Sequence, residues 1–187
     1  MNVGKARFLK LLNKENFRRL GFDTVPHAAD IKFLEGLPES FIPVEEIRAL
    51  NPSAALEPRH WEVNRIVYPV VIGGRVRSSM TTALVNGNWK VVSYGQVPLT
   101  RTVMAARFKS LNAAELNSAP FQYRIVTIFG LNEQFIGAFP TDARRPFLLI
   151  PTRPRNGLAV GVPQDGRSML MSLRPAALAL RGSNGPT

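Results

Sequence analysis

Residues 61–96 have the sequence WEVNRIVYPVVIGGRVRSSMTTALVNGNWKVVSYGQ, which contains the clearest strand and turn signals of the chain. It contains three runs of β-branched and aromatic residues, separated by Gly73-Gly74 and Asn86-Gly87. Asn-Gly favours a two-residue hairpin because both central residues of a type I′ turn need a positive φ. We therefore expect three neighbouring antiparallel strands, and Pro69 predicts an edge position or a bulge in the first of them.

The sequence outside this stretch combines helical periodicity with further strands. Helices are predicted over 3–20, over 24–36 with Asp23 or Thr24 as cap, and over 44–50. Pro98 is expected to open another helix that runs to about Leu116, and Asp165 or Ser168 to cap a final helix that restarts at Pro175. Strands are predicted over 121–129, 134–139 and 147–150.

This order predicts an α+β fold: a curved, mainly antiparallel sheet with helices packed on one face, preceded by N-terminal helices. The outline is similar to cystatin-like and nuclear-transport-factor-like folds, but no motif supports the similarity and it implies nothing about function. We expect an N-terminal helical segment over 1–52 that packs on the main domain. The α+β domain should then cover 53–182, with a flexible tail over 183–187.

The charge of the chain is strongly positive and unevenly distributed. The 187 residues carry 24 Lys or Arg and 13 Asp or Glu, which gives a formal net charge of +11. Residues 1–60 sum to +1 and residues 61–187 to +10, and no acid lies between Glu62 and Glu115. Eighteen of the 24 bases are Arg, whose planar guanidinium suits phosphate and carboxylate groups. The charge therefore favours an anionic partner.

Several chemistries are absent from the sequence. With no Cys, disulfides, thiolate metal sites and Cys nucleophiles are excluded. The two histidines, His27 and His60, lack the spacing of a zinc site, and neither a nucleophile elbow nor a phosphate-binding glycine loop is present. Paired carboxylates are also lacking in the second half of the chain. We therefore predict no catalytic residue, no metal and no cofactor.

Our first hypothesis is a non-enzymatic binding or interaction domain with an Arg-rich surface for an anionic macromolecule or an acidic protein surface. The residues expected to bind that partner are Arg75, Arg77, Lys90, Arg144, Arg145, Arg153 and Arg155. The alternative is RNA or DNA binding, in which Trp89 and Tyr94 stack on bases between these cations. A third hypothesis is a small-substrate enzyme that uses a cavity of the sheet lined by Ser78, Thr82 or Tyr94.

The start of the chain bears on membranes and location. The basic, amphipathic residues 3–20 would allow contact with anionic lipid, although the same apolar stripe would suit docking on the chain's own sheet. No run approaches the roughly 18 apolar residues that span a bilayer, and bases interrupt any secretory core. A cytoplasmic protein is therefore expected, unless a native leader precedes this sequence. The oligomeric state is left open.

Overall fold

The computed structural model describes residues 2–51, 61–95, 97–117, 120–142, 144–154 and 157–180. The chain divides into two compact units. Unit 1 comprises Met1–Pro38 and Asn64–Met104, and unit 2 comprises Glu39–Val63 and Ala105–Thr187. The domain boundaries predicted at 52 and 182 stay predictions, and the expected tail over 183–187 lies outside the described residues.

The strands of unit 1 form an antiparallel sheet in the order β5, β4, β3, β1. Their bounds are β1 Lys32–Phe33, β3 Val63–Ile72, β4 Arg75–Val85 and β5 Asn88–Tyr94. Gly73 and Gly74 have φ values of 54° and 74°, and Asn86 and Gly87 have 52° and 74°. Both predicted two-residue turns are therefore confirmed, with positive φ at each central residue.

The sheet of unit 1 contains a bulge beside Pro69. Val70 pairs with Ser78 and Val71 with Val76, so Arg77 has no partner in this register. A bulge of this kind increases the local twist and changes the direction of a side chain. The sequence predicted an edge or a bulge here, and the structure shows the bulge.

The helix α1, Asn2–Leu11, packs on the sheet of unit 1. Its Phe8 is fully buried in a cluster with Leu20, Phe22, Ile31 and Val70. The Phe8 ring lies edge-on to Phe33 at 5.4 Å between centroids, and aromatic pairs of this geometry are stabilising by about 0.5–1.5 kcal/mol. The apolar stripe of the predicted 3–20 helix thus belongs to the core, and the helix itself ends at Leu11.

The second predicted helix, over 24–36, is wrong. The structure has the 3-10 turn η1, Ala28–Asp30, followed directly by β1. Lys32 pairs with Val71 and Phe33 with Val70, and the Leu34 amide donates to the Pro69 carbonyl at 2.9 Å. Because the backbone groups of this segment bond to β3, they are not available for the hydrogen bonds of a helix.

The strands of unit 2 hydrogen-bond in the order β2, β6, β7, β8, β9. Their bounds are β2 Leu37–Phe41, β6 Phe121–Ile128, β7 Glu133–Pro140, β8 Leu148–Pro151 and β9 Gln164–Asp165, with the 3-10 turn η3, Phe129–Leu131, between β6 and β7. The β2–β6 pair is parallel, with Glu39 opposite Ile125, and the other pairs are antiparallel. The mainly antiparallel sheet and the α+β class are thus confirmed.

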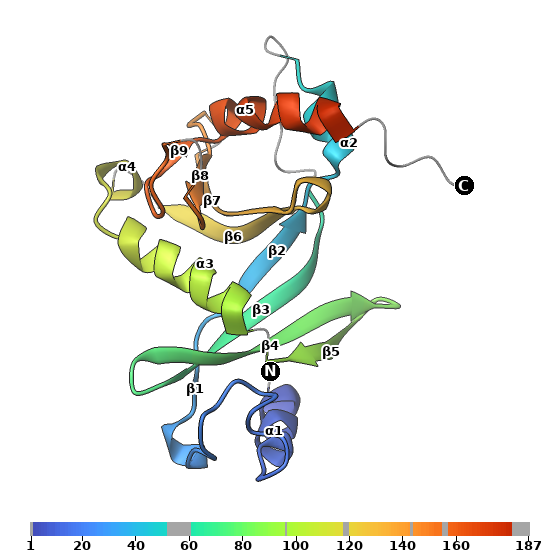
Figure 1. Cartoon of the computed structure of the whole chain (residues 1–187), viewed down its shortest axis with the longest axis vertical. Helices are drawn as coiled ribbons and strands as arrows, with labels where there is room; N and C mark the ends of the chain where they lie inside the picture. Colours follow the sequence, from blue (N-terminus) through green and yellow to red (C-terminus); the bar gives the residue numbers. More distant parts are fainter. Residues whose placement is uncertain are drawn as a thin grey trace. The chain divides into compact units, whose positions relative to one another are not determined.

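Two helices pack together on one face of these strands (Figure 1). They are α2, Val44–Ala49, and α5, Gly166–Ala179. Arg48 Nε donates to the Ala177 carbonyl at 2.8 Å, which ties the end of α2 to α5. The helix α5 continues through Pro175 instead of restarting there, and Asp165 caps it by accepting from the Ser168 amide at 2.8 Å.

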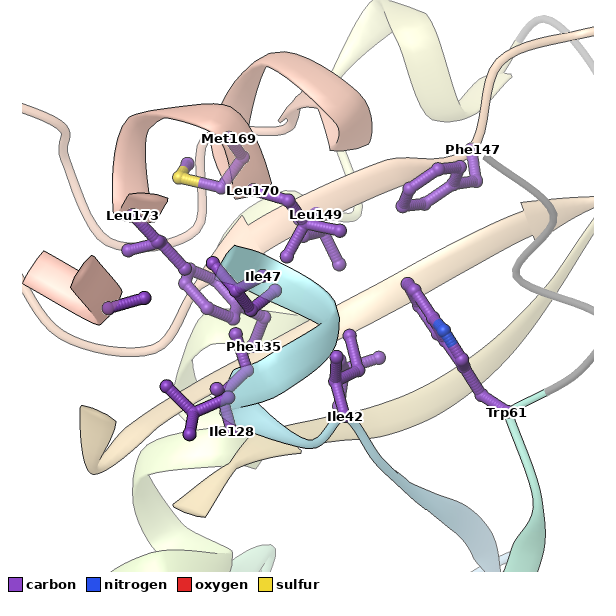
Figure 2. Close-up of a cluster of buried hydrophobic side chains, with 13 residues drawn as sticks. Ile42, Ile47, Trp61, Ile128, Phe135, Phe147, Leu149, Met169, Leu170 and Leu173 are labelled. Atoms are coloured by element: carbon purple, nitrogen blue, oxygen red, sulfur yellow. The ribbon is translucent and has the colours of Figure 1, made fainter. Parts of the chain in front are cut away.

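The core of unit 2 lies between these helices and the sheet (Figure 2). Ile47 from α2 and Leu170 and Leu173 from α5 are fully buried against strand residues, among them Phe135 and Leu149. Each such side chain contributes about 1.5–3 kcal/mol when it is removed from water. Trp61 closes one end of the cluster, edge-on to Phe147 at 5.8 Å between ring centroids.

Two further helices follow the hairpin of unit 1 in the chain: α3, Val97–Ser110, and α4, Ala114–Asn117. The guanidinium of Arg107, in the second half of α3, lies 3.5 Å from the ring centre of Tyr123 on β6. Tyr123 shares its face with Ile125, whereas Val126 points into the core under α2 and α5. The second half of α3 therefore contacts β6 on the face opposite to α2 and α5.

Candidate functional site

Unit 1 contains a pocket of about 680 Å³ between α1 and the sheet. Alternate residues of a strand share one face, and the register places Ile66 beside Thr82 and Tyr68 beside Met80. The pocket is lined by Gly4, Arg7, Ile66, Tyr68, Met80, Thr82, Trp89, Lys90 and Val91. The strands β3, β4 and β5 therefore form its floor, and α1 forms its opposite wall.

The position of α1 over this floor depends on Gly4. A Cβ atom at Gly4 would lie 2.8 Å from a methyl group of Val91 and 2.9 Å from the sulfur of Met80. Only glycine allows the helix backbone to approach the strands this closely. One turn further on, Phe8 fills the core, so the open space lies beside Gly4 and Arg7.

The charged groups that line the pocket are all cationic. Among the described residues, its lining contains no Asp, Glu or His, whereas Arg7 and Lys90 belong to it. Lys90 follows Trp89 on β5 and pairs with Ala83, so strand alternation directs its side chain to the opposite face. Arg7 is then the cation whose side chain belongs to the pocket.

The charge of Arg7 also acts on the neighbouring Tyr94. Burial raises the pKa of the Tyr94 hydroxyl, and the positive charge of Arg7 offsets this in part. The Tyr94 ring packs on Phe8 at 5.5 Å between centroids. This residue, predicted to stack on bases, is therefore half-buried in the core of unit 1, whereas Trp89 is 48% exposed at the pocket rim.

The other predicted residues of unit 1 lie on β4. Arg75 is exposed at the start of the strand. Arg77, at the bulge, donates to Asp23 at 3.1 Å, and its side chain is 33% exposed. One of the predicted cations is thus already paired with a carboxylate.

The remaining predicted residues belong to unit 2. Arg144 and Arg145 are exposed in the turn after β7, and Arg153 is exposed after β8. Asp142 accepts from the amide and from Nε of Arg144 at 3.0 and 3.2 Å, and these hydrogen bonds lower the pKa of its carboxyl. Arg155, like His60, lies outside the described residues. The predicted anion-binding set is therefore divided between the two units.

Sequence reasoning did not single out Arg7, Tyr68 or Met80 as lining residues. Gly4 and Arg7 are three residues apart on a helix, and this spacing puts both on one side. That spacing alone would not have indicated a pocket, because the opposite wall comes from strands 60 to 90 residues further on.

The described residues offer neither a cluster of metal ligands nor a membrane-spanning helix. Within the part of the chain that the structure describes, no group of three or more His, Asp or Glu is placed to hold a metal ion. No helix among the described residues is long and apolar enough to cross a bilayer. No family model, curated protein or solved structure matches this chain.

Proposed function

We propose that the chain is a non-enzymatic binding protein whose unit 1 carries a basic surface for an anionic partner. The observation that supports this most is the division of charge. Unit 1 contains twelve Lys or Arg and four Asp or Glu, a net charge of +8, whereas unit 2 contains twelve and nine, a net charge of +3. Within unit 1, the segment Asn64–Met104 holds no acid at all.

The arrangement of the bases makes them available to such a partner. Arg7, Lys10 and Lys14 are exposed in the N-terminal part of unit 1, as are Arg75 and Lys90 on its strands. Cations held on a rigid strand or helix raise the local concentration of an anionic partner and its association rate. Residues on the same framework also lose less freedom when the partner binds.

The pocket supports binding more than catalysis. An enzyme site of the acid–base type needs titratable groups that converge on a reacting atom. The described residues of the lining direct the side chains of Arg7 and Tyr68 into this pocket and include no carboxylate or imidazole to act as a general base near neutral pH. The small-substrate enzyme remains an alternative hypothesis with weaker support.

Single-stranded nucleic acid is the second candidate partner, and Trp89 favours it. Its indole is 48% exposed, at a pocket that Arg7 also lines. Exposed aromatic rings between cations stack on bases, and each stacked base contributes about 1–3 kcal/mol. Lipid contact by residues 3–20 is not proposed, because Phe8 and its neighbours fill the core of unit 1.

The test is a binding titration with the full-length chain and three fluorescent polyanions: single-stranded RNA, duplex DNA and an oligo-glutamate peptide. A basic surface predicts binding at 50 mM salt that weakens steeply toward 200 mM salt, because bound counterions are released. Trp89→Ala should weaken binding of the RNA alone if stacking contributes. Absence of binding to all three probes at low salt would overturn the proposed function.

A further inference from the structure

We propose that the pocket under α1 binds a small organic anion with a flat apolar body, whose anionic group pairs with Arg7. This goes beyond the proposed function, because a low-molecular-weight ligand can occupy the pocket whether or not a polymer binds the surface of unit 1. Its chemical class is that of an aromatic carboxylate, sulfonate or phosphate monoester.

The pocket has the size and the walls of a small-molecule site. Its volume of about 680 Å³ lies within the roughly 300–1,000 Å³ that such sites enclose. Ile66, Met80 and Val91 provide an apolar floor, and the rings of Tyr68 and Trp89 border it. Flat apolar groups gain from aromatic edges and faces and from the polarisable sulfur of methionine.

The charge of the ligand follows from Arg7. Within the described residues, Arg7 forms no ion pair, and no acid lines the pocket. The charge of Arg7 acts on the Tyr94 hydroxyl, whose pKa burial raises, so this hydroxyl is neutral at physiological pH and does not compensate the guanidinium. An uncompensated guanidinium beside an apolar floor favours a carboxylate, sulfonate or phosphate, which it binds with two parallel hydrogen bonds.

A further polar group in the floor has its bonding capacity unused. The Thr82 hydroxyl is shielded from solvent and has no hydrogen-bond partner among the described residues. Buried hydroxyls normally have a partner, and leaving one without costs about 1–3 kcal/mol. Because this oxygen is shielded from the pocket as well, a ligand could bond to it only after the Thr82 side chain rotates.

The pocket is preformed, because Gly4 and Phe8 hold α1 in place over the sheet by close packing. Gly4 sits directly on Met80 and Val91, and Phe8 is clamped by Phe22, Phe33 and Tyr94. The backbone of Gly36 also packs closely on two floor residues. A Cβ at Gly36 would lie 2.5 Å from a methyl group of Ile66 and 2.6 Å from the Tyr68 ring, so these two side chains have little room to move toward it. Binding of a ligand then requires little rearrangement of the protein, so little binding free energy is lost to it.

The experiment uses two fluorescent probes with the same aromatic body. One is 1-anilinonaphthalene-8-sulfonate, and the other is N-phenyl-1-naphthylamine, which lacks the sulfonate. The full-length protein should bind the sulfonate probe at one site per chain, as measured by isothermal titration calorimetry. Arg7→Gln should weaken the sulfonate probe by about tenfold or more and leave the neutral probe unchanged, because one charge-assisted contact is lost.

Two control variants make the outcome decisive. Lys10→Gln removes the same charge from an exposed position of α1 outside the pocket lining, and it should change the binding of neither probe by more than about twofold. Thr82→Phe places a ring in the pocket without changing the charge, and it should abolish binding of both probes. A near-UV circular dichroism spectrum of Arg7→Gln that matches the wild type shows that the variant is folded.

Three results would overturn the proposal: no one-site binding of the sulfonate probe, equal affinity of the wild-type protein for both probes, or binding to Thr82→Phe that matches the wild type. The polyanion titration is run on the same preparations. Its failure would leave the pocket proposal standing, and failure of the probes would leave the polyanion result standing, so the two proposals are tested separately.

Discussion

Arg77 and Asp23, 54 residues apart in the sequence, form an ion pair of 3.1 Å between Nη1 and Oδ2. Asp23 lies in the segment between α1 and η1, and Arg77 lies at the bulge of β4. The side chain of Asp23 is 85% exposed, so solvent screens the pair and it contributes only about 0–1 kcal/mol to stability. Its larger effect is to neutralise one cation of the basic unit.

Asp23→Asn should therefore strengthen polyanion binding. The substitution leaves the charge of Arg77 unopposed and should raise the affinity of unit 1 for an anionic probe a few-fold at 50 mM salt, with less effect at 200 mM salt. Asp30→Asn, at another exposed acid of unit 1, makes the same change in net charge and serves as control. An increase in fluorescence anisotropy titrations that is no larger than that of the control would argue against a contact at Arg77.

The hairpin of residues 73–94 could be predicted because its determinants are local. Gly73-Gly74 and Asn86-Gly87 fix the turns through positive φ, and the turns fix which residues face each other. The same applies to Asp165, whose side chain caps α5 three residues further on. Local chemistry of this kind can be recognised without knowing what packs against the element.

The strands β1 and β2 could not be predicted because their partners are distant. Lys32 and Phe33 pair with residues near 70, and Glu39 in the segment LPESF pairs with Ile125. Each strand is short, and β2 contains Pro38, so neither shows a period of two that a strand pattern would need. Tertiary hydrogen bonds therefore override the helical tendency of residues 24–36.

The candidate site likewise contains residues that local sequence signals indicate and residues that only the tertiary structure brings together. Trp89 and Lys90 were predicted from the hairpin, and both line the pocket. Arg7 was not, because its role depends on α1 lying across the sheet at Gly4, a contact between the first turn of the chain and residues 80 and 91. The basic composition of the sequence indicated an anionic partner, but only the fold indicates which bases lie beside an apolar cavity.

The cap of α5 gives a second prediction, on stability. Asp165→Ala removes the acceptor for the Ser168 amide and should lower the free energy of unfolding by about 0.5–2 kcal/mol in urea denaturation. Asp165→Asn keeps a side-chain acceptor, so it should lower the free energy of unfolding by less. Ser168→Ala retains the backbone donor, so it is the matched control. A loss in Ser168→Ala as large as that in Asp165→Ala would contradict the cap.

Alanine substitutions at Gly87 and Gly95 would distinguish two causes of destabilisation, backbone strain and steric contact. Gly95 has a φ of 83°, and a Cβ there would lie 2.5 Å from the carbonyl oxygen of Arg19. Gly87 has a φ of 74°, with nothing within 4 Å of its Cβ position. Gly87→Ala should cost about 1–2 kcal/mol of unfolding free energy from the left-handed conformation alone, and Gly95→Ala clearly more. Thermal unfolding measures both variants. Equal losses of unfolding free energy in Gly87→Ala and Gly95→Ala would show that the chain at Arg19 does not pack on Gly95.

The burial of the Tyr94 hydroxyl predicts that the folded protein loses stability at alkaline pH. Burial raises the pKa of its hydroxyl in the folded chain above the ordinary value of 10.0, against the opposing charge of Arg7. Above pH 10 the unfolded chain therefore releases this proton before the folded chain does, so the folded state binds more protons and the free energy of unfolding falls as the pH rises. Below that pH the group is protonated in both states and contributes no slope.

Tyr94→Phe should remove this part of the slope, so that its stability advantage over the wild type grows between pH 9 and pH 11. Near pH 7 the variant should be as stable as the wild type or slightly more stable, because the Tyr94 hydroxyl is buried without a hydrogen-bond partner among the described residues. Urea denaturation at each pH measures the difference, and Tyr68→Phe is the control for a tyrosine that lines the pocket. A parallel pH dependence of wild type and Tyr94→Phe would contradict the burial of this hydroxyl. Arg7→Gln provides the complementary test, since loss of its charge should move the absorbance titration of Tyr94 to still higher pH.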